Sequence, residues 1–334
     1  MRILIADSFP EQARGRLGNG GHECSYQPGL GTDELADAIA GSDVLVVRST
    51  RVTAATLADA DTLRLVIRAG SGVNTIDCDA ASDRGIYVCN VPGRNAVAVA
   101  ELAFGLLLSL DRNIPDNVAD LRAGRWNKQR YAQARGILGR SIGVVGLGQV
   151  GLAFAERAAA FGAQVYAVAK PDRSRAAVDR ARAAGITFVD SLPTLAQTCD
   201  VLSFHVPAAA ATRHLVDREL LSLVRPDTIL LNTSRADIVD EEALIEAMDA
   251  NGVRAGIDVL AGEPGQGSGP IDSRLARHPN VYATHHIGAS TEQAQHAVAT
   301  EVVRMVCAFD AGEVRHCVNL DLTPASSDRP VHRR

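Results

Sequence analysis

Residues 142–151, with the sequence IGVVGLGQVG, decide the fold because they join a short apolar strand to a glycine-rich turn and the start of a helix. The helical pattern Leu152–Phe161 follows directly, so the GxGxxG spacing has the strand–turn–helix context of a dinucleotide-binding fingerprint. Gly146 permits the tight turn, Gly148 lets the backbone approach a pyrophosphate, and Gly151 lets the helix pack closely on its strand. The free N–H groups and the positive end of that helix attract the anion. A glycine-rich turn without a ligand is the alternative interpretation.

The fingerprint lies in the middle of the chain, so the residues before it need a separate explanation. A length of 334 residues and a hydrophobic content of 46% are sufficient for two domains with buried cores. Short apolar runs alternate with longer helical patterns, which predicts βα units on parallel sheets. The runs are Ile3–Ala6, Val44–Val47, Leu65–Ile67, Ile86–Cys89, Ile142–Val145, Val165–Val168, Val201–Phe204, Ile229–Leu231 and Gly256–Val259, and a last short strand is expected at Asn280–Tyr282.

A break at Val91–Arg94 separates a smaller α/β unit from a larger one that holds the fingerprint. The helical stretch Ala96–Leu110 is apolar nearly all round, which predicts burial between domains or subunits. Thr291–Phe309 is expected to form a helix that returns to the first domain. The polar, proline-containing segment 321–334 is expected to be a disordered tail.

Composition argues against several classes of protein. A net charge of −5 and a pI near 6.0 do not favour binding to nucleic acid or to an anionic membrane. The longest apolar stretch is interrupted by Glu101 and is too short to span a bilayer, and the N-terminal run Ile3–Ala6 lacks the length of a signal peptide. The six cysteines include no CxxC pair and no His/Cys cluster at zinc spacing, so we expect reduced thiols, no metal and a cytoplasmic protein.

Four polar residues follow apolar strands at positions where chemistry is expected: Arg235, Asp258, Glu263 and His286. In doubly wound sheets ligands bind beyond the carboxyl ends of the strands, so these side chains should gather near the fingerprint. An Arg, an acid and a His there can bind a 2-keto carboxylate, orient an imidazole and move a proton. Arg235 as a surface ion-pair residue, Glu263 as an ordinary loop acid and the histidines as a solvated turn are the alternatives.

The chain resembles the D-isomer-specific 2-hydroxyacid dehydrogenases, most closely their 3-phosphoglycerate dehydrogenase branch, from about Val44 to Val318. The resemblance implies a Rossmann dinucleotide-binding domain, 94–286, inserted into a flavodoxin-like substrate domain, 1–93 and 287–320. Beside the fingerprint, the motifs that carry it are Val47–Thr50, Arg68–Asn74, Ala98–Leu102, Asn232–Arg235 with Ile238–Glu241, Gly256–Pro264 and His286–Thr291.

The resemblance also implies roles for individual residues. His286 would exchange a proton with the substrate hydroxyl, Glu263 would fix its tautomer, and Arg235 would bind and polarise the substrate. The implied substrate contacts are Arg48, which would meet a distal anion, together with Ser49, Gly70, Ser71, Gly72, Asn74, Arg235 and His286. The implied cofactor contacts are Ser71, Gly146, Gly148, Gln149, Val150, Gly151, Lys170, Val206, Thr233, Ser234, Asp258, Gly288 and Ala289.

The sequence departs from the family pattern in four places. Lys170 stands where the fingerprint expects a ribose-binding acid, and Arg173 and Arg175 follow, so NADP(H) is slightly favoured over NAD(H), although Asp172 is close and Lys170 can point into solvent. His285 replaces a proline, which leaves either a surface histidine or a second imidazole near the site. Ala236-Asp237 replaces a glycine pair. We expect no regulatory domain after Val318, because only about 16 residues follow it in this sequence.

The function expected from the sequence is hydride transfer between NAD(P) and C2 of a small anionic 2-hydroxy or 2-keto acid, with 3-phosphoglycerate as the first candidate. Another anionic 2-keto acid, such as a phosphonate analogue, is the second. A nucleotide-sensing protein like the NAD(H)-binding corepressors is an alternative from a different class. The family resemblance further implies a homodimer that packs through Ala96–Leu110 and the arm Arg125–Lys128.

Overall fold

The computed structural model describes residues 1–171, 173–264 and 268–320, which form two compact units. Unit 1 contains Met1–Asn95 and the residues from Ser290 onward, and unit 2 is Ala96–Ala289. The boundaries expected after residues 93 and 286 therefore lie two and three residues earlier than the observed divisions at 95 and 289. Asp172 and the tail expected to be disordered, 321–334, lie outside the described residues.

Unit 1 is built on a parallel five-stranded sheet with the order β2-β1-β3-β4-β5. The strands are β1 (Arg2–Ile5), β2 (Glu23–Tyr26), β3 (Val44–Val47), β4 (Leu65–Arg68) and β5 (Tyr87–Asn90). This is the flavodoxin-like doubly wound order, with its topological switch between β1 and β3. All four residues of β3 are buried, as expected for a central strand that is covered on both faces.

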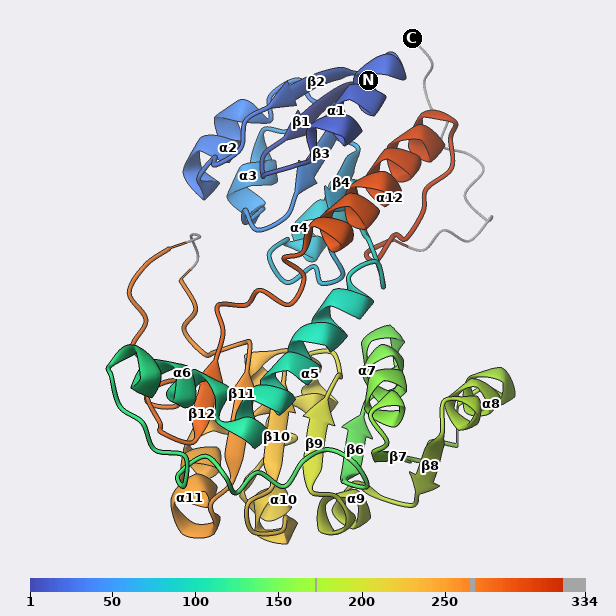
Figure 1. Ribbon diagram of the computed structural model, residues 1–334. Helices are drawn as coiled ribbons and strands as arrows, with labels where there is room; N and C mark the ends of the chain where they lie inside the picture. The colour runs from blue at the N-terminus through green and yellow to red at the C-terminus, as the bar shows by residue number, and fades with distance from the viewer. Residues whose placement is uncertain (172, 265–267, 321–334) are drawn as a thin grey trace. The chain divides into compact units, whose positions relative to one another are not determined.

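Helices cover both faces of this sheet (Figure 1). On one face α1 (Glu11–Asn19) lies beside α12 (Glu292–Asp310), which is the returning helix that the sequence predicts. On the other face lie α2 (Thr32–Ala38), α3 (Ala54–Ala58) and α4 (Cys78–Asp83). The segment after α12 pairs with β5, where Val318 N donates to Val88 O at 2.9 Å.

Unit 2 contains a parallel seven-stranded sheet with the order β12-β11-β10-β9-β6-β7-β8. The strands are β6 (Ser141–Val145), β7 (Gln164–Val168), β8 (Ile186–Val189), β9 (Val201–Phe204), β10 (Ile229–Asn232), β11 (Arg254–Ile257) and β12 (Val281–Ala283). The strands β6, β7 and β8 are added toward one edge of the sheet, and β9 to β12 are added toward the other. The strand order therefore reverses between β6 and β9, as in a Rossmann domain. The predicted fold class, two doubly wound parallel-sheet domains, is confirmed.

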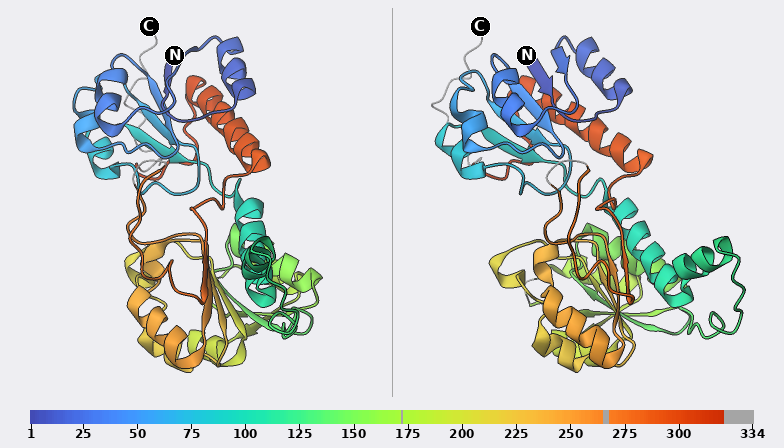
Figure 2. Two further views of the ribbon diagram at one scale, coloured as in Figure 1. Left: turned by 60° about the vertical axis from the view of Figure 1, so that its left-hand side comes forward. Right: turned by 90° about the vertical axis from the view of Figure 1, so that its left-hand side faces the viewer.

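The seven-stranded sheet also has helices on both faces, as the two turned views show (Figure 2). One face carries α5 (Ala96–Arg112), α7 (Gln149–Ala160) and α8 (Arg175–Ala183). The other carries α9 (Leu192–Thr198), α10 (Arg218–Leu223) and α11 (Glu241–Asn251). The fingerprint helix α7 packs against α5, where Phe104 and Phe154 have ring centroids 6.0 Å apart. Helix α6 (Ile114–Arg122) follows α5 directly.

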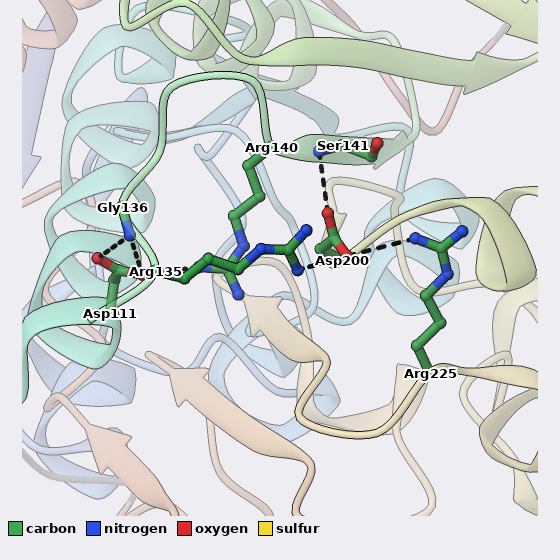
Figure 3. A network of polar contacts seen from close by, with 7 residues as sticks. All are labelled: Asp111, Arg135, Gly136, Arg140, Ser141, Asp200 and Arg225. Carbon is green, nitrogen blue, oxygen red and sulfur yellow. Dashed lines mark hydrogen bonds and ion pairs between the residues drawn. The ribbon is translucent and has the colours of Figure 1, made fainter. Parts of the chain in front are cut away.

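A polar network ties the segment before β6 to the sheet at the amino ends of its strands (Figure 3). Arg140 donates to Asp111 at 2.8 Å, and both side chains are buried. Asp200 accepts from Arg135 at 2.7 Å, from the Ser141 amide at 3.2 Å and from Arg225 at 3.4 Å. Because ligands of such sheets bind beyond the carboxyl ends of the strands, this network at the opposite edge has a structural role.

Several predictions of individual elements need correction. The apolar runs did not predict β2 and β8, which are edge strands of their sheets. The strand expected at Gly256–Val259 begins at Arg254 and ends at Ile257, so Asp258 is the first residue of the following loop. Among the described residues, no helix is both long and apolar enough to cross a membrane.

Candidate active site

The fingerprint turn has the backbone geometry that its glycines were expected to permit. Gly146 has a φ of 99°, and a side chain there would collide with the carbonyl of His205. A Cβ on Gly151 would collide with the Gly146 carbonyl, so α7 can approach β6 only because this residue is glycine. At Gly148 a Cβ would meet nothing within 4 Å, which leaves open space beside the turn.

The residues around this turn fit a bound dinucleotide. Gly148 is the N-cap of α7, so the amides of Gln149, Val150 and Gly151 have no acceptor inside the helix and are free to bind a pyrophosphate. Thr233 follows β10, and its buried Oγ1 has no hydrogen-bond partner in the described part of the chain. A buried hydroxyl without a partner costs free energy, which a ligand atom would recover.

The two residues expected to handle a proton are joined by a hydrogen bond. His286 Nδ1 lies 2.7 Å from Glu263 Oε2, while Glu263 Oε1 accepts the amide of Leu260 at 2.8 Å. The bond assigns a proton to Nδ1 and leaves Nε2 as the ring atom that can face a substrate. About half of the His286 side chain is exposed, and its φ of 51° is in the left-handed region.

Arg235 belongs to the same group of charges. Its guanidinium donates to the Ser234 carbonyl at 2.6 Å. Burial lowers the pKa of Arg235, and the nearby Glu263 carboxylate offsets only part of this effect. The buried Asn232 shapes this loop, because its Oδ1 accepts from Ser234 Oγ at 2.8 Å and its Nδ2 donates to the Arg235 carbonyl at 2.8 Å. The structure therefore brings Arg235, Glu263 and His286 together within unit 2.

Asp258 is only 1% exposed, and its carboxylate is occupied by the loop that carries His286. Its Oδ1 accepts from Thr284 Oγ1 at 2.6 Å and from Ile287 N at 2.9 Å, and its Oδ2 accepts from Gly288 N at 2.9 Å. A Cβ on Gly288 would lie 3.0 Å from the same carboxylate. The donors lie on both sides of His286, so Asp258 fixes this loop, a role that the sequence did not indicate.

In unit 1, Arg48 lies on a loop that another carboxylate holds. Asp7 Oδ2 accepts the amides of Arg48, Ser49 and Thr50 at 2.6, 3.0 and 3.1 Å. The Arg48 guanidinium reaches Ser290 Oγ, also in unit 1, at 3.3 Å. The amide of Ser49 is therefore already used, and its half-buried neighbour Arg48 supplies the positive charge of this loop.

The glycine-rich loop after β4 is anchored through its side chains and carbonyls. The Ser71 carbonyl accepts Asn90 Nδ2 at 2.6 Å, and Ser71 Oγ donates to Asn95 Oδ1 at 3.0 Å. The Gly70 carbonyl accepts the Val91 amide at 2.9 Å, and Asn74 is exposed. Within the described chain the amides of Ser71 and Gly72 donate to no acceptor, so they stay available to an anion.

The carboxyl end of β7, where a ribose-binding acid is expected, carries cations. Lys170 is exposed and forms no ion pair with any described residue. Arg173 folds back over the strand, with Nη1 3.3 Å from the Val168 carbonyl and its guanidinium 5.3 Å from the Phe188 ring centroid. Arg175 is almost fully exposed, and Ser174 caps α8.

The remaining candidates are placed as follows. Val206 lies beside the fingerprint turn, since its Cγ1 is 2.8 Å from the position of a Cβ on Gly146. His285 is exposed and makes no hydrogen bond within the part of the chain that the structure describes. Ala236-Asp237 forms the start of a short 3₁₀ helix, Ala236–Ile238, and Ala289 is half-buried. The described residues contain no group of three His, Cys, Asp or Glu side chains arranged to hold a metal ion.

A model of the family described as "D-isomer specific 2-hydroxyacid dehydrogenase, NAD binding domain" matches residues 104–288, more than half of the chain. The chain belongs to this dehydrogenase family. It is 37% identical over 327 residues to D-3-phosphoglycerate dehydrogenase of Methanocaldococcus jannaschii, covering 97% of the chain but 60% of that relative. It is 37% identical over 309 residues to hydroxypyruvate reductase of Thermotoga maritima, covering 91% of the chain and 97% of that relative.

Solved structures of similar fold include an acyclic imino acid reductase (Bsp5) in complex with NADPH and D-Arg. It has a TM-score of 0.81 and 26% identity, and the alignment covers 95% of the chain and all of that structure. The chain spans about 60% of the length of its archaeal phosphoglycerate dehydrogenase relative.

Sequence reasoning assigned no individual role to three residues that shape the loops of this family member: Asp7, Asn232 and Thr284. Asp7 directly follows the first apolar run, and Asn232 ends β10. The strand-end rule that selected Arg235 and His286 applies equally to Asp7, so the signal was present in the sequence. Thr284, the hydroxyl donor to Asp258, has no comparable signal because threonine is common in loops.

Proposed function

We propose that the chain is an NAD(P)-dependent oxidoreductase that transfers a hydride between nicotinamide and C2 of a small anionic 2-hydroxy or 2-keto acid. The observation that carries the proposal is the hydrogen bond of 2.7 Å between His286 Nδ1 and Glu263 Oε2, in the same unit as the GxGxxG turn. A nucleotide-sensing protein has no need of this paired acid and imidazole beside a half-buried arginine. The intact trio therefore favours an enzyme over a sensor.

In the proposed reaction the residues of this chain bind the substrate and move one proton. Glu263 holds Nδ1–H of His286, and an imidazolium stabilised in this way gives the Nε2 proton to the carbonyl oxygen at C2 during reduction. In the reverse direction Nε2 accepts the proton of the 2-hydroxyl group. Arg235 binds the carboxylate or carbonyl oxygen and stabilises the negative charge that develops there.

The cofactor is proposed to bind through the amides of Gln149, Val150 and Gly151, with further contacts from Val206, Thr233, Ser234 and Ala289. When bound, the nicotinamide supplies or accepts the hydride. Thr233 Oγ1, buried without a partner among the described residues, is the best-supported of these contacts. Contacts of Asp258 and Gly288 with the nicotinamide end are less supported, because each already bonds the other at 2.9 Å.

NADP(H) is the proposed preferred form of the cofactor. Lys170 provides an exposed positive charge at the end of β7, where an acid would repel a 2′-phosphate. The NADPH complex of the imino acid reductase supports the same choice. The family model is described as NAD binding, so NAD(H) is the alternative.

The proposed substrate is 3-phosphoglycerate or its 2-keto form, 3-phosphohydroxypyruvate. Arg48 is expected to bind the distal phosphate, and the free amides of Ser71 and Gly72 the carboxylate. The name of the archaeal relative supports this choice. Hydroxypyruvate is the second candidate, because the chain covers nearly all of the Thermotoga hydroxypyruvate reductase.

A homodimer is the proposed assembly. Trp126 is 80% exposed and Leu121 is 52% exposed, and both line a hollow of about 400 Å³ together with Tyr131. Large exposed apolar side chains gathered in one place are typical of an interface. Light scattering of the purified chain should give twice the monomer mass, and Trp126→Ser should shift it toward the monomer. A monomeric wild-type protein would exclude the dimer.

The function is tested by initial rates with 3-phosphohydroxypyruvate, hydroxypyruvate and non-phosphorylated 2-keto acids, each with NADH and with NADPH. The proposal predicts consumption of the reduced cofactor with at least one anionic 2-keto acid, and a higher kcat/KM for NADPH. Binding of NADPH without turnover on any of these acids would instead support the nucleotide sensor.

A further inference from the structure

An internal carboxylate occupies an anion-binding arrangement of backbone amides in unit 1. The amides of Arg48, Ser49 and Thr50 are consecutive, and all three converge on one oxygen of Asp7, at 2.6, 3.0 and 3.1 Å. Converging amides of this kind form the nests with which protein backbones bind phosphate and carboxylate ions. Here the nest is filled by the chain itself, so these amides are not available to a substrate.

The three hydrogen bonds to Asp7 fix the backbone of residues 48–50, the first half of the loop after β3. Strand β3 ends at Val47, and the next fixed point is Val52, whose amide donates to Thr75 O at 2.9 Å. Between these points the backbone of residues 48–50 makes no other hydrogen bond within the described chain. Bonds to a charged acceptor are stronger than those between neutral groups, so the carboxylate determines where the Arg48 backbone lies.

The Arg48 side chain keeps its positive charge available. Its guanidinium makes a long bond of 3.3 Å to the neutral Ser290 hydroxyl, and no carboxylate in the described part of the chain pairs with it. The side chain is half-buried. A guanidinium that is placed by its backbone and is not neutralised by an acid is suited to bind a phosphate through two parallel bonds.

We propose that Asp7 is a positioning residue that sets the specificity for substrates with a distal anionic group, by fixing the loop that presents Arg48. This inference rests on the proposed function, in which Arg48 binds that group. Because Asp7 fills the amides of the loop, recognition of the distal anion depends on one guanidinium. In the proposed site Asp7 touches neither the substrate nor the cofactor.

The test is a double-mutant cycle with the full chain, using Asp7→Ala, Arg48→Gln and the double variant. Each is assayed with 3-phosphohydroxypyruvate and with hydroxypyruvate, which lacks the phosphate. Asp7→Ala should raise KM for the phosphorylated substrate about tenfold, as expected for the loss of one well-placed charged contact. It should leave kcat and the KM for hydroxypyruvate within about twofold. In the Arg48→Gln background the same substitution should add almost nothing, because its effect acts through Arg48.

Two controls separate this effect from a loss of folding. Asp7→Asn keeps an oxygen acceptor for the amides and should recover most of the affinity for the phosphorylated substrate. Asp43→Ala removes another carboxylate of unit 1, one that accepts the Arg2 amide at 2.8 Å, and should not alter the ratio of the two KM values. Equal losses on both substrates, or additive effects of the two substitutions, would overturn the inference.

The outcome also distinguishes the inference from the proposed function. If Arg48→Gln raises KM only for the phosphorylated substrate while Asp7→Ala changes neither KM, the positioning role is wrong and the function stands. If Arg48→Gln changes both KM values equally, the proposed recognition of a distal anion by Arg48 is itself wrong.

Discussion

In each unit an aspartate at the carboxyl edge of the sheet accepts hydrogen bonds from a neighbouring loop, but the two aspartates differ in burial and in the number of oxygens used. Asp7 follows β1 and holds the loop after the neighbouring strand β3, and Asp258 follows β11 and holds the loop after the neighbouring strand β12. Asp7 uses one oxygen and is half-buried, whereas Asp258 uses both oxygens and is 1% exposed. The more rigid arrangement holds the loop of His286, the proposed proton donor.

The difference has a physical reason. Proton transfer requires a donor within hydrogen-bond distance and at a correct angle, so a small displacement of the imidazole costs much of the rate. Binding a phosphate with a long, flexible arginine side chain tolerates more movement. We therefore expect substitutions in the unit 2 arrangement to reduce turnover, and those in the unit 1 arrangement to reduce affinity.

The largest effect is expected from His286→Ala, which removes the proposed acid–base group of unit 2. Turnover should fall by about 10²–10⁴-fold, the usual contribution of general acid–base catalysis. Binding of NADPH, followed by its fluorescence, should stay near the wild-type value, since the fingerprint amides are untouched. Wild-type turnover in this variant would refute the assignment of the proton to His286.

Asp258→Asn should have the next largest effect. The amide of Asn places a donor where Ile287 N or Gly288 N now donates, so the His286 loop loses at least one bond. We expect kcat to fall about 10–100-fold, because a displacement of about 1 Å at a reacting group has that cost. Thr284→Val, which removes one donor and keeps the carboxylate, is the matched control and should lose less.

The same variant tests the role of Asp258 implied by the family resemblance. If the carboxylate mainly fixes the loop, the KM for NADPH should stay within about twofold while kcat falls. A rise in the KM for NADPH with little change in kcat would instead support direct contact with the nicotinamide end.

A smaller effect is expected from Lys170→Asp at the end of β7. The acid would repel a 2′-phosphate and accept bonds from ribose hydroxyls, so kcat/KM for NADPH should fall and that for NADH should rise. Because Lys170 is exposed, the change in each should be only about three- to tenfold. An unchanged ratio of the two cofactors would show that Lys170 points into solvent.

The smallest effect at neutral pH is expected from His205, whose carbonyl lies over Gly146, because its effect on stability appears only in acid. Burial lowers the pKa of its imidazole from 6.5 to about 3. The folded state therefore keeps His205 neutral while the unfolded state takes up a proton below pH 6.5, so stability should fall as the pH decreases from about 6.5 toward 3. Denaturant unfolding of His205→Gln should show a flatter dependence, and identical slopes in both proteins would contradict this.

Most of the fold could be predicted because strands covered on both faces leave a clear signal. β3 and β9 are buried at every position, and their apolar runs gave the observed boundaries. β2 has an alternation of exposed and half-buried residues, and β8 is interrupted by Thr187. Both lie at sheet edges, where one side of the strand needs no apolar side chains, so neither gave a continuous run.

The sequence could indicate which charged residues lie together in the candidate site, but not the residues that hold their loops. Arg235, Glu263 and His286 could be selected because they follow apolar strands, and ligands of doubly wound sheets bind beyond the carboxyl ends of the strands. The part played by Asp258 could not, because a sequence does not show which loop amides will converge on a carboxylate. Asp7 carried the same strand-end signal, but its partners lie more than forty residues away in the chain.

The division of roles between Asp258 and Asp7 is tested most directly by comparing kcat and KM for Asp258→Asn and Asp7→Ala on 3-phosphohydroxypyruvate with NADPH. Asp258→Asn should lower kcat with little change in either KM, and Asp7→Ala should raise the KM of the 2-keto acid with little change in kcat. If both variants change the same constant, the proposed division of roles between the two units is wrong.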